Sequence, residues 1–203
     1  MFPLRQRPLC LTIIVICMMA WLSHAQFCYN QETSDFILKI HNRIRSAVGG
    51  CRINKLENDE ELEEKAKNWT ERCEFKHREK DGYGENLGLS TSKKNLTAII
   101  AQLTEAWAQE SSLCNHQTQT RCGDCCHYSQ IVWSTTVKLG CYITRCPLIK
   151  VGKKEYKNAW FLACFYTPRG NNSGKKAYEI VCETKCMEGQ IEENGLCAGA
   201  ARD

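Results

Sequence analysis

The sequence predicts an α+β protein, an α-β-α sandwich in which helices cover both faces of a small antiparallel sheet and disulfides staple the fold. Three observations support this prediction. The first half of the chain carries apolar residues at helical spacing, the second half carries two aromatic-rich apolar segments typical of strands, and 15 of the 203 residues are cysteines. A few amphipathic helices and one small sheet bury their apolar faces most economically against each other.

The first 25 residues have the pattern of a secretory signal peptide. Arg5 and Arg7 precede an apolar run over 9–22, and the sequence Ser-His-Ala at 23–25 forms a small-x-small cleavage site. The run is shorter than the roughly 20 residues that a spanning helix needs. The alternative is a signal anchor that stays in the membrane, but the cleavage site favours removal. We therefore expect a secreted, extracellular protein that does not span a membrane after signal cleavage.

Cleavage after Ala25 leaves 178 of the 203 residues, a length that suits one domain. We expect this domain over 26–171, followed by a short cysteine-containing tail over 172–203. Loss of Arg5 and Arg7 lowers the formal net charge from +4 to +2. The net charge therefore gives no indication of a nucleic-acid or acidic-membrane partner.

Three helices are predicted from apolar residues that recur three and four positions apart. They span 34–48, where Gly49-Gly50 ends the helix, 58–75 and 95–110. Each buries one apolar stripe. The expected N-caps are Thr33 or Ser34 for the first helix and Asn58 or Asp59 for the second. The expected inward residues are Ile37, Ile40, Ile44 and Val48, then Leu62, Ala66, Trp69 and Cys73, then Leu96, Ile99, Ile100, Leu103 and Trp107.

Strand signals come mostly later in the chain. Residues 140–144 and 159–167 are rich in apolar and aromatic side chains. The polar segment 150–157, with Gly152 as its turn residue, joins them, which predicts a β-hairpin. Residues 82–89 add a third strand.

Thirteen cysteines remain after signal cleavage, and four of them fall in the polar segment 111–126, which reads as a long loop. Export and this cysteine density favour disulfides over free thiols. The odd number leaves at least one thiol free or paired with another chain. The spacing Cys122-x-x-Cys125 suggests zinc as a competing use, but it is a single pair in an oxidising compartment.

Three sequons, at Asn68, Asn95 and Asn171, follow the N-x-S/T rule. In a secreted chain they are candidate N-glycosylation sites, and we expect these residues at the surface.

Four stretches carry a resemblance to a known family. They are His41-Asn-Arg-Ile-Arg, Tyr83-Gly-Glu-Asn-Leu, His127-Tyr-Ser-Gln-Ile-Val-Trp and Cys164-Phe-Tyr-Thr-Pro-Arg-Gly-Asn. In this order, with Trp107 and Glu110 between them, they resemble the CAP superfamily (SCP/TAPS), which includes cysteine-rich secretory proteins, antigen 5 proteins and pathogenesis-related class 1 proteins. The resemblance covers about residues 34–171. The cysteine-rich insertions look most like the venom-allergen-like proteins of parasitic worms.

The resemblance implies two disulfides, Cys73 to Cys146 and Cys141 to Cys164, the second across the hairpin. Each long-loop bridge contributes roughly 2–4 kcal/mol. The chain departs from the family pattern at two positions. Cys126 replaces the glycine usual before the site histidine, and Phe165 stands where a polar residue is usual, so we expect a reshaped site rim.

The resemblance also implies a central cleft lined by two histidines and two glutamates. The matching positions are His77, Glu85, Glu110 and His127. Imidazole nitrogens and carboxylates suit zinc or a similar divalent cation, and no obligatory cofactor is expected. The four groups should titrate as a coupled set between pH 5 and 7. Taken singly, each has a structural alternative as a surface histidine, a local ion pair or a helix-end residue.

The resemblance implies binding or signalling rather than catalysis. Ser129 lies two residues after His127, which raises a Ser/His/Glu peptidase hypothesis. A strained nucleophile turn is not visible in the sequence, so no enzyme activity is expected.

The first function hypothesis is lipid binding between amphipathic helices, which gains about 0.8 kcal/mol per buried methylene. A fatty acid ranks above a sterol because the loop 111–126 carries no aromatic residue. The stripe Ile37, Ile40 and Ile44 could face such a slot, although core packing is the stronger interpretation for any one of them, and no lipid-binding residue is assigned. The alternative is a secreted effector that binds a host or neighbouring-cell receptor through its cysteine-ordered loops.

Overall fold

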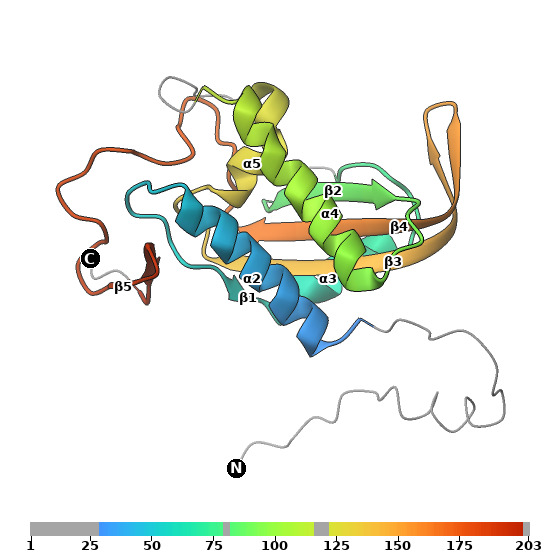
Figure 1. Cartoon of the computed structure of the whole chain (residues 1–203), viewed down its shortest axis with the longest axis horizontal. Coiled ribbons are helices and arrows are strands. Elements are labelled where there is room, and N and C mark those ends of the chain that lie inside the picture. Colours follow the sequence, from blue (N-terminus) through green and yellow to red (C-terminus); the bar gives the residue numbers. More distant parts are fainter. Residues whose placement is uncertain (1–28, 79–81, 116–121, 201–203) are drawn as a thin grey trace, which may run out of the picture.

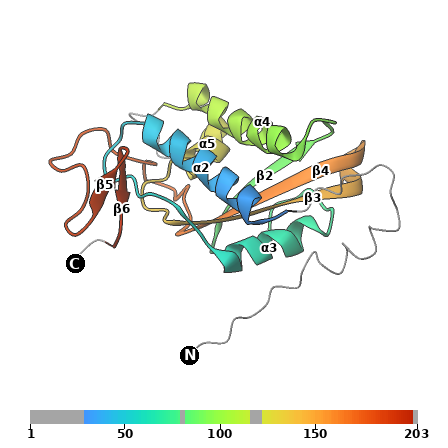
Figure 2. The same ribbon diagram turned by 60° about the horizontal axis from the view of Figure 1, so that its bottom comes forward.

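The structure is a computed structural model that describes residues 29–78, 82–115 and 122–200. It contains a four-stranded sheet with helices on both faces (Figures 1 and 2). The helices are α2 (Gln31–Ala47), α3 (Glu60–Thr70), α4 (Leu96–Gln109) and α5 (Cys126–Ile131), with short 3-10 turns η1 (Glu110–Leu113) and η2 (Gly123–Cys125). Helix α3 covers one face, and α2, α4 and α5 cover the other (Figure 2). The predicted α-β-α sandwich is confirmed.

The sheet has the strand order β1-β3-β4-β2. Its strands are β1 (Glu57–Asn58), β2 (Gly84–Ser90), β3 (Lys138–Val151) and β4 (Lys154–Thr167). The short β1 is parallel to β3, whereas the other pairs are antiparallel. A separate two-stranded ribbon in the tail joins β5 (Ile191–Glu193) to β6 (Leu196–Ala198).

Over residues 159–166, strand β4 is buried on both faces and separates two apolar clusters. Phe161, Ala163 and Phe165 pack with α3. The alternate residues Leu162 and Tyr166 pack with α2, α4 and α5. A strand side chain points to each face in turn, so a strand covered on both sides is apolar almost throughout. Every inward residue predicted for the 95–110 helix is buried in the second cluster.

The helix ends differ from two predictions. Asn30 caps α2 by accepting a hydrogen bond from the Thr33 backbone N–H, because asparagine is among the best N-cap residues. Ser34, one of the predicted caps, is buried inside the helix and donates to Glu63. Helix α3 is capped by Asp59, as predicted, but it ends at Thr70, before the left-handed backbone of Cys73 (φ 56°).

The hairpin is longer than predicted. The polar connection expected over 150–157 belongs mostly to the strands, because Val151 already pairs with Lys154 and leaves a two-residue turn at Gly152. Backbone pairing does not require apolar side chains, so charged residues can extend a hairpin into solvent. Gly152 supplies the positive φ (59°) that such a turn needs.

Six disulfides join the twelve cysteines of the described ranges. They are Cys51–Cys182, Cys73–Cys146, Cys114–Cys125, Cys122–Cys126, Cys141–Cys164 and Cys186–Cys197. Two of them are the pairs implied by the resemblance. Cys122 and Cys125 are both oxidised, so they offer no thiolates for zinc. The thirteenth cysteine of the expected mature chain, Cys28, lies outside the described residues, as does the predicted signal peptide.

In the described ranges, none of the helices has the length and apolar character needed to cross a bilayer.

Arg45, from the first family motif, is fully buried between α2 and the segment that follows α5. Its guanidinium donates to the carbonyl oxygens of Asn54 (2.5 and 2.9 Å), Ile131 (2.6 Å), Trp133 (2.8 Å) and Thr136 (3.2 Å). Burial lowers the pKa of Arg45 to about 9, so the group stays protonated at neutral pH. Carbonyl dipoles therefore replace water around this charge.

Replacing the arginine tests this role. Arg45→Met should lower the free energy of unfolding by at least about 3 kcal/mol, because each buried acceptor left without a donor costs about 1–3 kcal/mol. Arg43→Met is the matched control, since Arg43 is exposed and forms one surface ion pair with Glu105, worth at most about 1 kcal/mol. Urea unfolding followed by circular dichroism measures both. Equal losses of unfolding free energy in the two variants would contradict this structural role of Arg45.

Candidate metal-binding cleft

The four predicted site residues lie on four separate elements and meet as two His–Glu pairs. His77 follows α3, Glu85 is on β2, Glu110 directly follows α4, and His127 is in the first turn of α5. The pairs are His77 with Glu85 and His127 with Glu110.

The first pair lies at the surface. His77 Nδ1 and Glu85 Oε1 are 2.5 Å apart, and Glu85 Oε2 accepts from the backbone N–H of Arg78 at 3.2 Å. The hydrogen bond to Glu85 raises the pKa of His77. The His77 side chain is 68% exposed whereas that of Glu85 is 12% exposed. The carboxylate is therefore fixed by the sheet and holds a more accessible imidazole.

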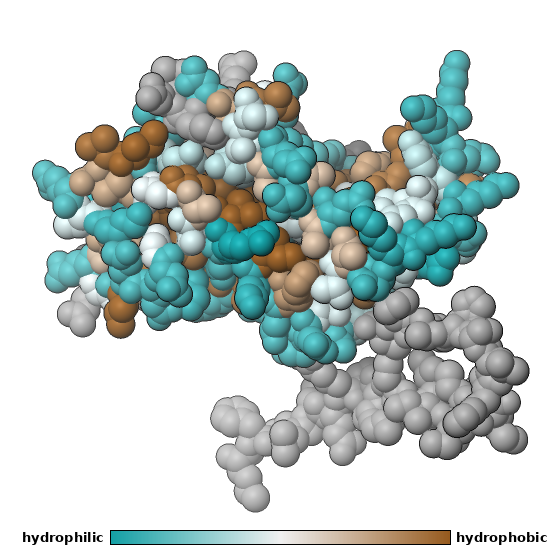
Figure 3. Space-filling model, viewed as in Figure 1, coloured by the Kyte–Doolittle hydropathy of each residue, from teal (hydrophilic) through white to brown (hydrophobic). Residues whose placement is uncertain are grey.

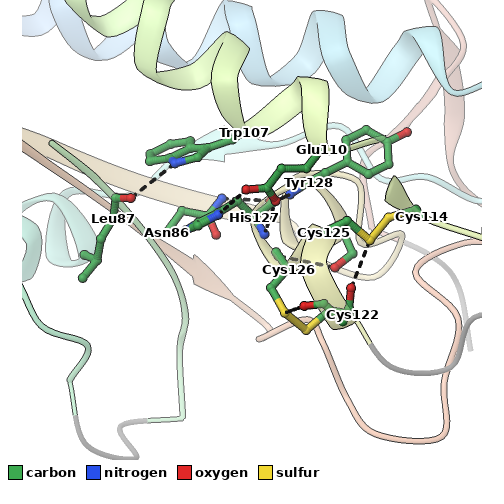
Figure 4. A network of polar contacts seen from close by, with 12 residues as sticks. Asn86, Leu87, Trp107, Glu110, Cys114, Cys122, Cys125, Cys126, His127 and Tyr128 are labelled. Atoms are coloured by element: carbon green, nitrogen blue, oxygen red, sulfur yellow. Dashed lines mark hydrogen bonds and ion pairs between the residues drawn. A yellow bond between two sulfur atoms is a disulfide. The ribbon is translucent and has the colours of Figure 1, made fainter. Parts of the chain in front are cut away.

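The second pair joins the end of α4 to the start of α5 (Figure 4). Glu110 Oε1 contacts His127 Nδ1 at 2.6 Å, and Glu110 Oε2 accepts from the backbone N–H groups of His127 (3.0 Å) and Tyr128 (3.3 Å). A carboxylate is well placed there because the first N–H groups of a helix lack intrahelical acceptors. One glutamate thus starts α5 and orients its histidine.

Two further contacts hold His127 in place. The Trp107 ring stacks on the imidazole with a centroid separation of 5.8 Å and an interplanar angle of 14°. Trp107 Nε1 donates to the Leu87 carbonyl at 3.3 Å, and Asn86 Nδ2 donates to the His127 carbonyl at 3.0 Å (Figure 4). Strand β2 therefore fixes the ring of His127 as well as Glu85.

This geometry divides the four residues into two chemical roles. A carbonyl or carboxylate partner on one ring nitrogen of a histidine leaves the other nitrogen for a ligand. Here both Nδ1 atoms face glutamates, so the two Nε2 atoms are the candidate ligand atoms and the glutamates orient the rings. Within the described residues, no three of these four place ligand atoms within 4.8 Å of one another.

One other group does meet that distance, namely His41, Cys141 and Cys164. Cys141 and Cys164 form a disulfide, so neither sulfur is a thiolate that could bind a metal. His41 is also fully occupied by hydrogen bonds. This buried group is structural.

A cleft of about 290 Å³ lies beside the first pair. Its lining includes His77, Glu85, Gln130, Phe165 and Asn171. Phe165, one departure from the family pattern, is buried beneath the guanidinium of Arg78 at 5.2 Å. Cys126, the other departure, is bonded to Cys122. Phe165 thus lines the cleft, whereas Cys126 lies directly before His127 and outside the cleft lining, and the reshaped rim stays a prediction.

The glycine of the Gly-Glu-Asn stretch is needed for close approach. A Cβ on Gly84 would lie 2.0 Å from Gln130 Oε1. That oxygen accepts from the Gly170 backbone N–H at 2.9 Å. Gly84 thus lets α5 and the segment after β4 contact β2 directly. This contact positions Gly84, Gln130 and Gly170, which line the cleft.

A buried polar network, which the sequence analysis did not identify, connects the site to α2. His41 Nδ1 donates to the Ile37 carbonyl (2.9 Å), so its Nε2 accepts from the Tyr166 hydroxyl (3.0 Å). The same hydroxyl accepts from Asn86 Nδ2 at 3.1 Å. Burial lowers the pKa of His41 to about 4, in agreement with this neutral tautomer. The only signal in the sequence was a histidine and a tyrosine within otherwise apolar faces.

Ser129, the residue behind the peptidase hypothesis, bonds elsewhere. Its hydroxyl lies 2.6 Å from Asn171 Oδ1 and 3.3 Å from the Cys126 carbonyl. Neither acceptor is a general base, and a nucleophilic serine needs one within hydrogen-bond reach. The contacts are those of a structural hydroxyl.

The three sequons differ in exposure. Asn68 and Asn95 are exposed, and Asn95 uses only its Oδ1, as the N-cap of α4. Asn171 is half-buried, and its Nδ2 donates to the Cys126 carbonyl at 2.8 Å. A glycan on Asn171 would be attached to that nitrogen, whereas Asn68 and Asn95 offer open surface.

The comparisons with known proteins identify the family. The model of the family "CAP: Cysteine-rich secretory protein family" matches residues 38–166. The chain belongs to the CAP family. The resemblance inferred from the four sequence stretches is thereby confirmed.

Among curated relatives, this CAP protein is 30% identical over 164 residues to human cysteine-rich secretory protein LCCL domain-containing 2, covering 73% of this chain and 32% of the relative. It thus spans about a third of that protein. It is also 30% identical over 176 residues to mouse GLIPR1-like protein 1, covering 80% and 71% of the two chains.

Solved structures of worm proteins share the fold. The crystal structure of NaASP2 with Zn²⁺ aligns with a TM-score of 0.70 at 28% identity, covering 87% of this CAP protein and all of that chain. Venom allergen-like protein 4 of Schistosoma mansoni aligns with a TM-score of 0.57 at 26% identity, covering 77% and 100%. The expected likeness to worm venom-allergen-like proteins is confirmed.

The buried network makes a prediction about pH. The pKa of His41 falls from 6.5 to about 4 on folding, so between these values the unfolded chain binds a proton that the folded chain does not. Stability should therefore decline as pH falls from about 6.5 to 4, by up to about 3 kcal/mol from this residue. Urea unfolding of the wild type and of His41→Gln across this range measures the effect. The variant should show the shallower pH slope, and identical slopes would contradict the prediction.

Proposed function

We propose that this CAP protein is secreted and acts outside the cell by binding rather than by catalysis. We further propose that the two His–Glu pairs bind zinc or another divalent cation through His77, which lines the cleft, and His127, which lies outside that lining at the start of α5. The observation that carries the proposal is the pair of Nδ1–carboxylate contacts at 2.5 and 2.6 Å. Metal-binding histidines in proteins almost always have such a partner, which fixes the ring and makes the other nitrogen a stronger ligand.

The donor set suits a labile ion. Two imidazole nitrogens are ligands that zinc favours, but structural zinc sites use four protein ligands. A site with two histidines would complete its coordination with water, and the ion would exchange with the medium. The related protein NaASP2 was crystallised with Zn²⁺, which supports this proposal. The disulfides support an oxidising, extracellular location.

Protons should compete with the metal at the same imidazoles. The hydrogen bond with Glu85 raises the pKa of His77, so the ring remains protonated to a higher pH than an isolated histidine. A metal needs the neutral ring. Affinity should therefore decrease as pH falls through the pKa of His77, and the cleft would release its ion in acidic surroundings.

Calorimetric titration with zinc tests the site. The double variant His77→Ala/His127→Ala should lose binding, and Glu110→Gln should weaken it by about 10- to 100-fold because His127 loses its orienting carboxylate. Glu105→Gln is the matched control, since Glu105 is an exposed residue one turn earlier on α4. Binding by the wild type should weaken as pH falls through the raised pKa of His77. Unchanged binding by the double variant would remove the proposed site.

The second candidate function is lipid binding, with a fatty acid ranked above a sterol. A groove of about 490 Å³ is lined by residues of α2 and α4, with apolar contributions from Ile44, Val48 and Ala108. Ligand pockets generally occupy about 300–1,000 Å³, so this volume suits an acyl chain. Ile37, Ile40 and Ile44 all pack into the main core. Of this predicted stripe, only Ile44 also lines the groove.

Bound lipid can be tested on protein made in eukaryotic cells. Solvent extraction and mass spectrometry should find a fatty acid in the wild type and much less in Ala108→Trp, whose ring would fill the groove. Ala106→Trp on the exposed side of α4 is the control. Absence of lipid from all three proteins would contradict this candidate function, as would equal amounts in the two variants.

The receptor alternative would use the disulfide-bonded segment after α4. Two disulfides, Cys114–Cys125 and Cys122–Cys126, tie this segment together. Leu113 is 62% exposed beside it. Loops held by disulfides are suited to presenting a contact surface.

A further inference from the structure

The end of the β3–β4 hairpin projects beyond the helices that cover the sheet (Figures 1 and 2). Its strands remain paired out to Val151 and Lys154. The inner side chains Ile149 and Tyr156 still contact the α3 cluster. The hairpin is therefore a supported, ordered projection.

Basic residues gather at this end of the molecule. The hairpin carries Lys150, Lys153, Lys154 and Lys157, β3 contributes Arg145, and the connection from β2 to α4 contributes Lys93 and Lys94. Arg145 and Ser90 flank Trp160 on neighbouring strands, so the β2–α4 connection begins beside the base of the hairpin (Figures 1 and 2). The surface of this end is mostly hydrophilic in Figure 3.

These charges are largely uncompensated. Seven of the 27 Lys and Arg residues lie here, and Glu155 is the one acidic residue of the hairpin among the chain's 23 Asp and Glu. Glu155 pairs with Lys150 at 3.1 Å, and Arg145 stacks on Trp160 at 5.7 Å. Across the part of the chain that the structure describes, the other five lysines form no ion pair. A cluster of like charges attracts polyanions, and the binding gains affinity from the counterions that the polyanion releases.

The surrounding side chains narrow the class of polyanion. Membrane-binding surfaces add apolar groups that enter the lipid, but Leu148, at 39%, is the one exposed large apolar residue of the described hairpin. Single-stranded nucleic acids require aromatic platforms for stacking. Trp160 is buried, and Tyr156 packs inward. A sulfated polysaccharide needs only clustered cations. The hairpin end presents them on both of its faces, because Lys150 and Lys157 lie on the opposite face of the pleat from Lys154.

We propose that the hairpin end, together with Lys93 and Lys94, is a docking surface for sulfated glycosaminoglycans. The proposal rests on the proposed extracellular location, and it is independent of the cation and lipid sites. It would hold the secreted protein near cell surfaces or matrix and leave the His/Glu cleft accessible to its own ligand.

Surface plasmon resonance with immobilised heparin oligosaccharide tests the proposal on the full mature chain. The wild type should bind, and its affinity should decrease steeply as NaCl rises from about 50 to about 200 mM. The triple variant Lys153→Gln/Lys154→Gln/Lys157→Gln should bind at least about tenfold more weakly. The control Lys39→Gln/Lys55→Gln/Lys175→Gln removes the same charge from exposed lysines elsewhere and should bind like the wild type.

Three outcomes would overturn the proposal. Equal losses in the two triple variants would show a response to net charge alone. Equal affinity for desulfated heparin would exclude sulfate recognition. Stronger, hairpin-dependent binding to vesicles of phosphatidylserine in phosphatidylcholine would assign the surface to membranes. Zinc titration of the hairpin variant separates this test from the proposed function, because its cleft residues are unchanged.

Discussion

The buried Arg45 guanidinium supplies hydrogen-bond donors to several separate segments of the chain. It replaces water for the carbonyl oxygens of Asn54, Ile131, Trp133 and Thr136. A buried cation is costly unless it is fully hydrogen-bonded, and buried carbonyls are costly without donors. The guanidinium therefore requires the carbonyl groups, and the carbonyl groups require the guanidinium. Their hydrogen bonds fix the end of α5 and the chain leading into β3 against α2. The candidate site depends on this constraint because His127 is carried by α5.

From that anchor, the site is assembled by short-range contacts between elements. Glu110 caps α5 and orients His127, while Asn86 connects β2 to the same helix and to the buried Tyr166. Each contact is partly structural and partly functional. The two histidines therefore share a common support, strand β2, although they follow different helices. Such second-layer contacts determine which imidazole nitrogen faces a ligand.

Net charge was a poor guide to the surface of this protein. The expected mature chain is nearly balanced, yet the hairpin end gathers lysines with a single acidic partner in the hairpin. Exposed charges separated by more than about 8 Å are largely screened in physiological salt. A local basic surface can therefore act on a polyanion whatever the rest of the chain carries. The order in which charges occur along a hairpin matters more than their sum.

The sequence by itself predicted the sandwich and its three long helices, because these depend on periodicity, caps and motifs that are local in the chain. It also named four candidate site residues through the family resemblance, and their role stays a prediction. It overestimated α3 and underestimated the hairpin. Only the tertiary structure decided that the site is two His–Glu pairs, that Arg45 is surrounded by carbonyls, and that His41 is neutral and bonded to Tyr166. Those outcomes depend on which polar groups from distant segments share a buried space. The local sequence pattern carries no information about these partners, because tertiary packing determines which polar groups form hydrogen bonds.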